Sequence, residues 1–417
     1  MTEATPPTVT QLGEHAVVLG GSLSGLACAA VLAERFASVT IVERDGLPPT
    51  GEQRKGVPQG RHVHVLLPAG LRSLAELFPG IIDDLAALGA NVFDPRGLRF
   101  NIAGGSLLLE RAGMRFVAAS RPLIEGIARE RVRAMDNVRF AERCDACGLT
   151  TTADGSRVTG VRLRSRNAGG AEEAVEADLV VDATGRGSRS LRWLAALGYT
   201  VPREERLEVG VHYTTRLFRR APQTFGEWRN VTVAIPPGER RGAVALAVEG
   251  DRWLVTLIGI LGERPPTALD AFLEYARTLW ADDVYAVVAD AEAIGEASTG
   301  AFAANERRRY DRLRRFPGGY VVIGDAVCAL NPVYAQGMSV ALGEALALAS
   351  VLDAHGLDRV GRRFFRRTRR IVDVAWSMAT DADLGHPGVE GRRTARWRVF
   401  RGGRRRGLTG SEEASHA

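Results

Sequence analysis

The first regular pattern of apolar residues along the chain predicts a strand, a turn, a helix and a second strand. From His15 the sequence reads HAVVLGGSLSGLACAAVLAERFASVTIVERD. A short apolar run precedes Gly20, an alanine-rich stretch of helical composition follows Gly25, and a second apolar run ends at Glu43. This order predicts a βαβ unit in which a glycine turn leads into the helix.

Two later segments repeat the order of apolar strand, turn and helix. In the segment 177–194, ADLVVDATGRGSRSLRWL, the strand runs into Asp182 and is followed by two glycines. In the segment 319–352, GYVVIGDAVCALNPVYAQGMSVALGEALALASVL, the strand ends in a Gly-Asp pair at Asp325, and a long apolar helix begins near Gly337. Short, continuously apolar strands are typical of a buried parallel sheet, so we expect all of these strands in one central sheet.

The middle of the chain alternates between apolar and polar residues, with glycine and proline at the ends of each segment. A period of two predicts antiparallel strands of a sheet that has one solvated face, and two helical segments follow these strands. The strands are expected at Leu207–Phe218, Asn230–Pro237, Gly242–Gly250 and Asp251–Ile260, and the helices at Thr267–Leu279 and around Asp282–Ala293.

These patterns predict an α/β fold in which an antiparallel sheet is inserted into a unit built on a parallel sheet. We expect the first part of that unit at residues 14–200, the inserted sheet at 201–302 and the second part at 303–358. The segment 359–417 is rich in arginine and loses its apolar periodicity toward the end, so we expect it to be partly disordered. Such an ending predicts low stability or association with another chain.

The charge balance changes the picture of possible partners. The 417 residues carry a formal net charge of +6, which raises the question of an anionic partner such as nucleic acid. However, 15 arginines stand against four acids between Arg359 and Gly407, so the residues before Arg359 are slightly acidic as a group. The composition is that of a globular protein, with 45% hydrophobic residues, and we do not expect it to bind nucleic acid.

Cysteine content and hydropathy bear on the cellular compartment. Four cysteines are too few for a disulfide framework, and the C-x-x-C pair Cys144 and Cys147 has no second pair at metal-ligand spacing, so we expect no metal site. The apolar stretch 320–352 is interrupted by charged residues and Pro332, which favours a buried strand and helix over a membrane span. No signal peptide is evident, and we expect a cytoplasmic protein without an integral membrane segment.

The glycine turn before the first helix predicts a phosphate-binding site. Backbone N–H groups at a helix N-terminus are free, and the helix dipole is positive there, so a pyrophosphate can be bound. Gly20 permits the tight turn and Gly25 lets the helix pack closely on the strand, while Ser22 replaces the middle glycine of the usual fingerprint. Glu43 is placed to accept hydrogen bonds from an adenosine ribose, and Arg44 could lie against the adenine.

With these three segments on the page, the sequence resembles the glutathione-reductase-type FAD proteins. Within them it is most similar to the single-component flavoprotein monooxygenases of the aromatic hydroxylase group, in particular to the actinobacterial branch of polyether epoxidases, which resemble squalene epoxidases. The resemblance rests on GGSLSG with Glu43 and Arg44, on the Asp-Ala-Thr-Gly run from Asp182, and on the Gly-Asp pair at Asp325 followed by NPVYAQGMS. It implies a Rossmann domain of the ββα type for FAD, an inserted substrate sheet and a helical C-terminus.

The resemblance also implies roles for individual residues. Asp325 would hydrogen-bond the ribityl or ribose hydroxyls, and backbone around Gly337 and Met338 would face the flavin N1–C2 carbonyl edge. Pro332 would lie beside the isoalloxazine, while Ala335 stands where the family pattern has glycine. The residues expected to act in catalysis are Pro332, Gly337 and Met338. The residues expected to bind FAD are Gly20, Gly21, Ser22, Leu23, Ser24, Gly25, Glu43, Arg44, Arg61, Arg121, Ala146, Asp182, Gly324, Asp325, Gly337 and Met338.

The loop RKGVPQGRHVHVLL at 54–67 follows the second strand. Family loops at this place carry an arginine that reaches the FAD pyrophosphate, so the resemblance implies Arg61 for this role and Arg54 as a weaker choice. His62 and His64, two positions apart, suggest a metal pair or a covalent flavin link, but no further ligand stands near them in the sequence. The alternative is a polar loop folded against the cofactor.

The resemblance implies a monooxygenase that reduces FAD with NADPH or NADH and captures O2 as a C4a-hydroperoxide. One oxygen then passes to a hydrophobic small molecule, by epoxidation or hydroxylation, in a reaction we assign to secondary metabolism. Epoxidation requires no general base, and the sequence contains no convincing acid–base pair. Residues of the sheet that could touch substrate are His212, Tyr213, Arg216, Trp228 and Trp253.

Three other functions compete with this interpretation. A flavin halogenase would need a W-x-W-x-I-P segment and an active-site lysine, whereas the chain has only Lys55, in a different context. An FAD-dependent reductase or dehydrogenase of polyprenyl or polyketide chains shares the same motifs and stays open. So does an FAD-binding protein that has lost turnover.

Overall fold

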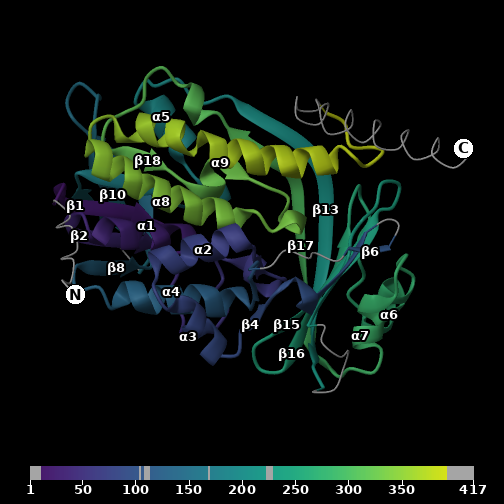
Figure 1. Cartoon of the computed structure of the whole chain (residues 1–417). Helices are drawn as coiled ribbons and strands as arrows, with labels where there is room; N and C mark the ends of the chain where they lie inside the picture. The colour runs from purple at the N-terminus through teal and green to yellow at the C-terminus, as the bar shows by residue number, and fades with distance from the viewer. Residues whose placement is uncertain (1–10, 103–104, 108–112, 168–169, 222–228, 392–417) are drawn as a thin grey trace, which may run out of the picture.

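The computed structural model describes residues 11–102, 105–107, 113–167, 170–221 and 229–391. Trp228 and the arginine-rich end of the chain after residue 391 lie outside this part, so the expectations for them stay predictions. The described chain forms an α/β fold built on a parallel sheet and separate antiparallel sheets, with a helical C-terminal part, as expected (Figure 1).

The central sheet is parallel and brings together strands from three distant parts of the sequence. Its order is β18-β12-β1-β2-β8, and its core consists of residues such as Val17, Val180 and Val321, which are fully buried. Burial on both faces explains why these strands are continuously apolar rather than alternating. The strands are β1 (Gly13–Leu19), β2 (Phe36–Glu43), β8 (Val138–Glu142), β12 (Leu179–Asp182) and β18 (Tyr320–Val322).

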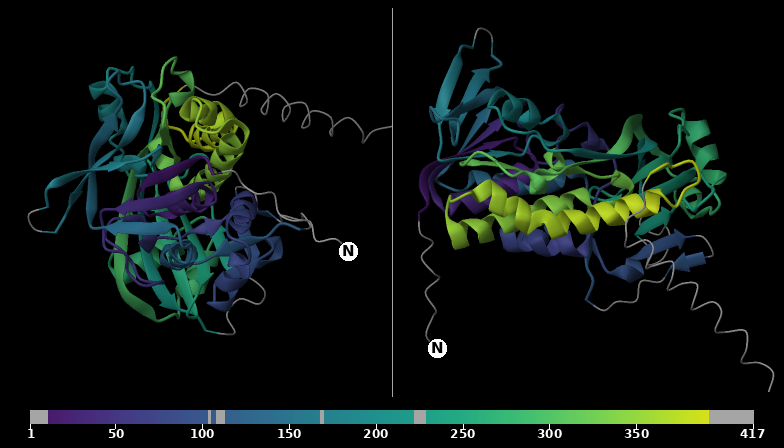
Figure 2. Two further views of the ribbon diagram at one scale, coloured as in Figure 1. Left: turned by 90° about the vertical axis from the view of Figure 1, so that its left-hand side faces the viewer. Right: turned by 90° about the horizontal axis from the view of Figure 1, so that it is seen from above.

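Helices cover one face of the parallel sheet, and a small antiparallel sheet lies on its other face (Figure 2, left). The helix after the glycine turn is apolar on nearly all sides and is buried against α8, α2 and α4, as expected for a core helix. The helices are α1 (Leu23–Ala33), α2 (Pro68–Leu77), α3 (Ile81–Ala87), α4 (Arg121–Arg133), α5 (Ser190–Ala196), α8 (Gly337–His355) and α9 (Val360–Asp383). The small sheet has the order β11-β10-β9 and comprises β9 (Cys144–Thr151), β10 (Val158–Ser165) and β11 (Glu172–Glu176).

A second, larger sheet has the order β19-β17-β13-β16-β15-β14-β5-β6. The four strands expected between residues 207 and 260 are present. The 16-residue strand β17 pairs with β13, so the expected boundary at residue 302 falls inside one continuous strand. One face of the sheet packs against α6 (Leu269–Arg277) and α7 (Asp283–Val288), on the outer side in Figure 1. The strands are β5 (Leu98–Ile102), β6 (Gly105–Leu107), β13 (Glu204–Arg219), β14 (Asn230–Val233), β15 (Arg241–Val248), β16 (Arg252–Gly259), β17 (Ala293–Arg308) and β19 (Cys328–Ala329).

Short elements connect these layers. Three short strands form the sheet β3-β7-β4, and single turns of 3-10 helix stand at several loop ends. The short strands are β3 (Val65–Leu66), β4 (Asn91–Phe93) and β7 (Phe116–Ala118). The 3-10 turns are η1 (Pro58–Arg61), η2 (Pro95–Gly97), η3 (Gly185–Gly187), η4 (Tyr310–Arg312), η5 (Gly324–Ala326) and η6 (Pro332–Tyr334).

The register of the parallel sheet places the predicted motifs at one edge. Leu19 pairs with Val42 and with Asp182, and Asp182 pairs with Val322, so β1, β2, β12 and β18 all end at the same level. The glycine turn, Glu43 and the Gly-Asp pair at Asp325 therefore meet at the carboxyl ends of the strands. Ligands of open α/β sheets bind at this edge.

Candidate functional site

The turn between β1 and α1 accepts no side chain at two of its glycines. Gly20 has a φ of 101°, and a Cβ there would lie 2.7 Å from the carbonyl oxygen of Ala183. A Cβ on Gly25 would lie only 1.8 Å from the carbonyl oxygen of Gly20. The absence of side chains at these two positions lets the start of α1 lie directly against the end of the strand.

The N-terminus of α1 has no acidic residue of its own in the first turn, but it meets a carboxylate from α4. Glu125, which is 3% exposed, accepts hydrogen bonds from the Ser22 hydroxyl and, over 3.3 Å, from the backbone N–H of Leu23. Arg121 is the first residue of α4, and its Nη2 lies 2.6 Å from Glu125 and 3.3 Å from the Ser22 hydroxyl. Sequence reasoning identified Arg121 but missed Glu125, although the spacing of four residues places both on one helix face.

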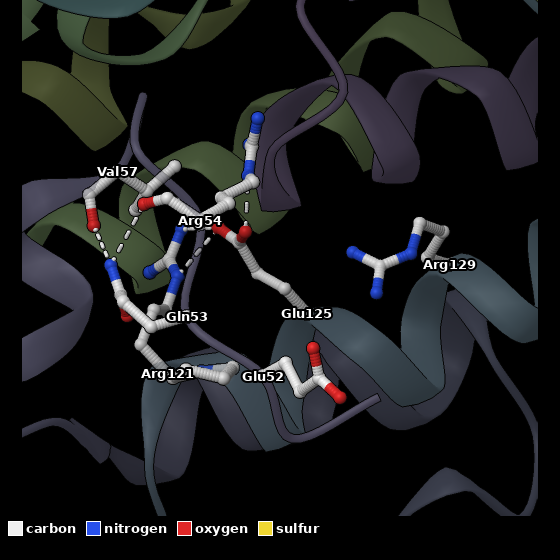
Figure 3. A pocket seen from close by; sticks show the side chains of 8 residues that line it. Glu52, Gln53, Arg54, Val57, Arg121, Glu125 and Arg129 are labelled. Carbon is white, nitrogen blue, oxygen red and sulfur yellow. Dashed lines mark hydrogen bonds and ion pairs between the residues drawn. The ribbon is translucent and has the colours of Figure 1, made fainter. Parts of the chain in front are cut away.

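Arg54, rather than Arg61, joins the acid at the end of β2. Glu43 accepts hydrogen bonds from the backbone N–H of Gly21 over 2.8 Å, and Arg54 Nη1 lies 2.8 Å from the same carboxylate oxygen. The Nη2 of Arg54 lies 3.6 Å from Glu125 (Figure 3). One buried guanidinium therefore spans the two buried carboxylates of Glu43 and Glu125. Arg61 and Arg44 are exposed and stand outside this cluster.

A small cavity of about 10 Å³ lies within the charged cluster, which is room for about one water molecule (Figure 3). The burial of Glu125 raises its pKa, but Arg121, Arg54 and the Ser22 hydroxyl outweigh that effect and hold the pKa below its ordinary value. Glu125 is therefore ionised at neutral pH. The cavity is lined by Glu52, Gln53, Arg54, Val57, Arg121, Pro122, Glu125 and Arg129.

Asp325 lies beside the start of α8. A Cβ placed on Gly337 would lie 3.8 Å from Asp325 Oδ1, and the first turn of α8 contains no acidic residue. Asp325 is exposed, yet the protein around it raises its pKa, an effect that Arg121 and Arg186 oppose. The carboxylate thus lies near the guanidinium groups of Arg121 and Arg186 and near the positive end of a 19-residue helix.

Asp182 is engaged within its own turn. It is fully buried, and its two oxygens accept hydrogen bonds from Thr184, from Ser188 over 2.6 Å, from Ser190 and from Tyr320. No part of this carboxylate is left for a ligand. Asp182 therefore shapes the turn at the edge of the site, which differs from the direct contact that the resemblance implies.

Beneath the Gly-Asp pair lies a carboxyl group that sequence reasoning did not single out as a site residue. Glu344 on α8 is fully buried, and it accepts a hydrogen bond of 2.7 Å from the backbone N–H of Gly324. Its other oxygen has no hydrogen-bond partner among the described residues. Burial, with a smaller contribution from Asp325, raises the pKa of Glu344 to about 8, although the Gly324 N–H acts in the opposite direction.

The residues expected around the flavin ring stand in the turn before α8. Pro332 is exposed, Met338 is 8% exposed, and Ala335 has a φ of 52°. This left-handed conformation explains why the family pattern has glycine where this chain has Ala335. Ala146 lies in β9, half-buried, and its carbonyl oxygen accepts a 3.4 Å hydrogen bond from Arg189.

Arg186, which acts on Asp325, also lies near Tyr213 on the inner face of the large sheet. Tyr213 contacts the His62 ring, with 4.5 Å between the ring centroids, and the His62 Nδ1 lies 2.8 Å from the Thr215 hydroxyl. Burial, with a smaller contribution from Arg61, lowers the pKa of His62 to about 4. The pKa of Tyr213 is raised by burial, which Arg186 opposes.

Only one of the described sheet residues named as possible substrate contacts lies on this inner face. Along β13, Tyr213 shares a face with Thr215, whereas His212 and Arg216 alternate with them and Trp253 packs with the α6 and α7 cluster. His64 lies on the cofactor side instead. Burial lowers its pKa to about 3, with Arg121 acting in the same direction.

Metal and membrane features are also defined for the described part of the chain. No group of three or more His, Cys, Asp or Glu side chains gathers there in a way that could hold a metal ion, and His62 and His64 point to different partners. One helix, α8, is long and apolar enough to cross a membrane. It packs against α1, α2 and α9 inside the protein.

The site and the fold together define a flavoprotein. Residues 14–359 match the family described as "FAD binding domain", and the chain belongs to this family. The glycine turn before α1, Glu43 at the end of β2 and the arginines 54 and 121 fit a dinucleotide with a pyrophosphate.

Among curated proteins, the chain is similar to Protein Rv3254 of Mycobacterium tuberculosis (strain ATCC 25618 / H37Rv). The two are 33% identical over 400 residues, which is 92% of this chain and 83% of that protein.

Solved structures share the fold at lower identity. PqsL of Pseudomonas aeruginosa, a probable FAD-dependent monooxygenase, superposes with a TM-score of 0.66 at 18% identity over 89% of this chain and 97% of that one. A 2-methyl-3-hydroxypyridine-5-carboxylic acid oxygenase gives 0.64 at 20% identity, over 89% and 92%. CmlS, a flavin-dependent halogenase, gives 0.65 at 18% identity, over 93% and 70%. At these identities the similarity establishes the fold.

Proposed function

We propose that the protein is an FAD-dependent monooxygenase that uses NADPH or NADH and O2 to oxygenate a hydrophobic small molecule. One observation carries this proposal: the Arg186 guanidinium lies close enough to act on the pKa of Asp325, which stands beside the start of α8, and on that of Tyr213, which stands on the large sheet. Arg186 influences Asp325 on the cofactor side and Tyr213 on the sheet. A flavin held at Asp325 would present its ring to a substrate under the sheet.

The chain's own residues would hold and polarise the cofactor. Bound FAD accepts hydride from the nicotinamide and activates O2. Arg54 and Arg121 would bind the pyrophosphate at the start of α1, and Asp325 would accept hydrogen bonds from the ribityl chain. The N-terminus of α8 would stabilise negative charge on the reduced ring, because its dipole and free N–H groups point toward it.

His62 and Tyr213, which meet on the inner face of the large sheet, are both uncharged at neutral pH. His62 is neutral because its pKa is lowered to about 4, and Tyr213 is protonated because its pKa is raised. Epoxidation of an alkene suits such a site, since it needs no proton acceptor. Hydroxylation of a phenol would instead use the His62 Nε2, which has no hydrogen-bond partner among the described residues.

The test uses FAD-loaded protein reduced by NADPH without oxygen and then mixed with O2 and a panel of polyketide and terpenoid alkenes and of phenols. We expect faster NADPH consumption with a substrate and a product that has gained one oxygen atom. A product that has gained two hydrogen atoms would identify a reductase instead. Protein that binds FAD but never consumes NADPH or NADH faster with any compound would reject both enzymatic functions.

A further inference from the structure

A buried polar cluster connects the end of the last described helix to the turn before α8. Asp383, the final residue of α9, is 1% exposed. Its Oδ2 accepts a 2.6 Å hydrogen bond from Asn305 on β17, and its Oδ1 accepts hydrogen bonds from Asn331 over 2.9 Å and from the Tyr334 hydroxyl over 2.7 Å. Three donors from two elements therefore converge on one carboxylate.

The orientation of both asparagine amides is fixed by other hydrogen bonds. The Asn305 side-chain oxygen accepts the backbone N–H of Asn331 over 2.7 Å, and the Asn331 side-chain oxygen accepts the N–H of Val333 over 3.1 Å. Both amides must then direct their NH2 groups toward Asp383. A carboxylate accepts hydrogen bonds at both oxygens. An amide in its place would point its own NH2 group either at Asn305 or at Asn331 and Tyr334, which are themselves donors.

The cluster surrounds the residue that the proposed function sets beside the flavin. Asn331 caps the short helix Pro332–Tyr334, and Tyr334 is its last residue. The residues on either side of Pro332 and Val333 are therefore both hydrogen-bonded to Asp383. Asn305 lies on β17, which pairs with the central strand β13 of the large sheet. Through Asp383, the turn is thus fixed relative to the sheet that carries Tyr213.

We propose that Asp383 is a positioning residue for oxygenation: it holds the Pro332–Tyr334 turn, and with it the start of α8, at a set place relative to the large sheet. This inference rests on the proposed function for its consequence in catalysis, but its structural part stands on the hydrogen bonds alone. Burial raises the pKa of Asp383, while the hydrogen bonds from Tyr334, Asn305 and Asn331 act in the opposite direction and favour the carboxylate.

The first test measures hydrogen exchange of the turn in Asp383→Asn. The NH2 group of the new Asn side chain must face the NH2 group of either Asn305 or Asn331, so one hydrogen bond is lost. The backbone amides of Val333 and Ala335 should then exchange hydrogen about ten-fold faster. The matched control is Asp373→Asn on the same helix. It also removes one negative charge, and it breaks the 2.5 Å ion pair between Arg307 and Asp373. It does not alter the hydrogen bonds of the Pro332–Tyr334 turn, so the amides of that turn should exchange hydrogen at the wild-type rate.

Two further variants separate positioning from a general loss of stability. Tyr334→Phe removes one donor without a charge change, so it should fold well and loosen the turn by a smaller factor. The exchange variant Asn331→Asp with Asp383→Asn restores complementarity, because the new Asn can accept from Asn305 and donate to the new Asp. It should recover most of the protection that Asp383→Asn loses.

The second test uses FAD-loaded protein and records the visible spectrum of the bound flavin, the FAD dissociation constant, and the fraction of NADPH oxidation that yields product. Asp383→Asn should bind FAD within about three-fold of wild type, since the charged cluster of Arg54 and Glu43 is intact, but should shift the spectrum and uncouple NADPH oxidation from oxygenation. Wild-type turn exchange in Asp383→Asn, or no recovery in the exchange variant, would overturn the inference. A wild-type protein that oxygenates nothing would reject the proposed function instead, and the exchange data would still decide the role of Asp383 in the turn.

Discussion

Arg54 Nη1 lies 2.8 Å from Glu43 Oε2, and both side chains are buried. The same guanidinium reaches Glu125, whose carboxylate accepts from the start of α1. A buried arginine between two carboxylates holds the acid that would bind the adenosine ribose and stands next to the proposed pyrophosphate position. This pair links the loop after β2 to the dinucleotide site.

Arg54→Gln should weaken FAD binding by about ten-fold or more, because it removes a cation from the pyrophosphate position and leaves two buried carboxylates without it. The measurement is the FAD dissociation constant, from quenching of flavin fluorescence. Arg61→Gln is the matched control in the same loop and should stay within about two-fold of wild type, since Arg61 is exposed. If Arg61→Gln caused the larger loss, the structural placement of these two arginines in binding would be wrong.

Gly25→Ala should abolish FAD binding and lower the free energy of unfolding by several kcal/mol, because the new Cβ would lie 1.8 Å from a backbone oxygen. Gly187→Ala provides the control, as a Cβ there meets open space. Thermal unfolding followed with and without FAD distinguishes the two. A Gly25→Ala protein with wild-type stability would mean that α1 does not pack on the turn as described.

Ala335→Gly should raise the free energy of unfolding by up to about 1 kcal/mol. The φ of 52° costs alanine about 1–2 kcal/mol, and glycine would relieve this cost. Part of the relief, about 0.5–1 kcal/mol, is lost again because glycine gives the unfolded chain more conformational entropy. Ala349→Gly in the middle of α8 should lower stability by about 1 kcal/mol, because its backbone is helical. Equal losses in both variants, measured by denaturant unfolding, would show that residue 335 is not strained.

Glu344 should make stability fall as the pH rises. Its pKa is raised from about 4.5 to about 8 in the folded protein, so the native state holds a proton that the unfolded state has released between these values. The loss should approach about 1.4 kcal/mol per pH unit within this range, and Glu344→Gln should remove it. Glu76→Gln, at an exposed carboxyl, should leave the pH profile of unfolding as in wild type. Parallel profiles for wild type and Glu344→Gln would contradict the buried, partly unsatisfied carboxyl.

The sequence was a good guide to elements defined by local pattern. The βαβ unit, the strands between residues 207 and 260 and the long helix from Gly337 all occur as expected. Gly25 is required because a side chain there would clash with the carbonyl oxygen of Gly20, five residues earlier in the same turn. Such features follow from periodicity and backbone conformation, which neighbouring residues determine.

Features that depend on distant partners were harder to predict. Arg54 and Arg61 are both arginines of one polar loop, and only the packing of that loop on Glu43 and Glu125 decides which is buried. Asp182 matched a motif, but its hydrogen bonds to Ser190 and Tyr320 were not visible in the sequence. Asp383 stands in a segment whose arginine content suggested disorder farther on, and its role arises from donors about 50 and 80 positions away in the chain.

Oxygenation itself is the central claim, and isotope-labelled O2 tests it most directly. FAD-loaded protein is supplied with NADPH, a substrate that accelerates NADPH consumption, and labelled O2, and the product is analysed by mass spectrometry. We expect one labelled oxygen atom in each product molecule. A product without the label, or one that has only gained hydrogen, would contradict it.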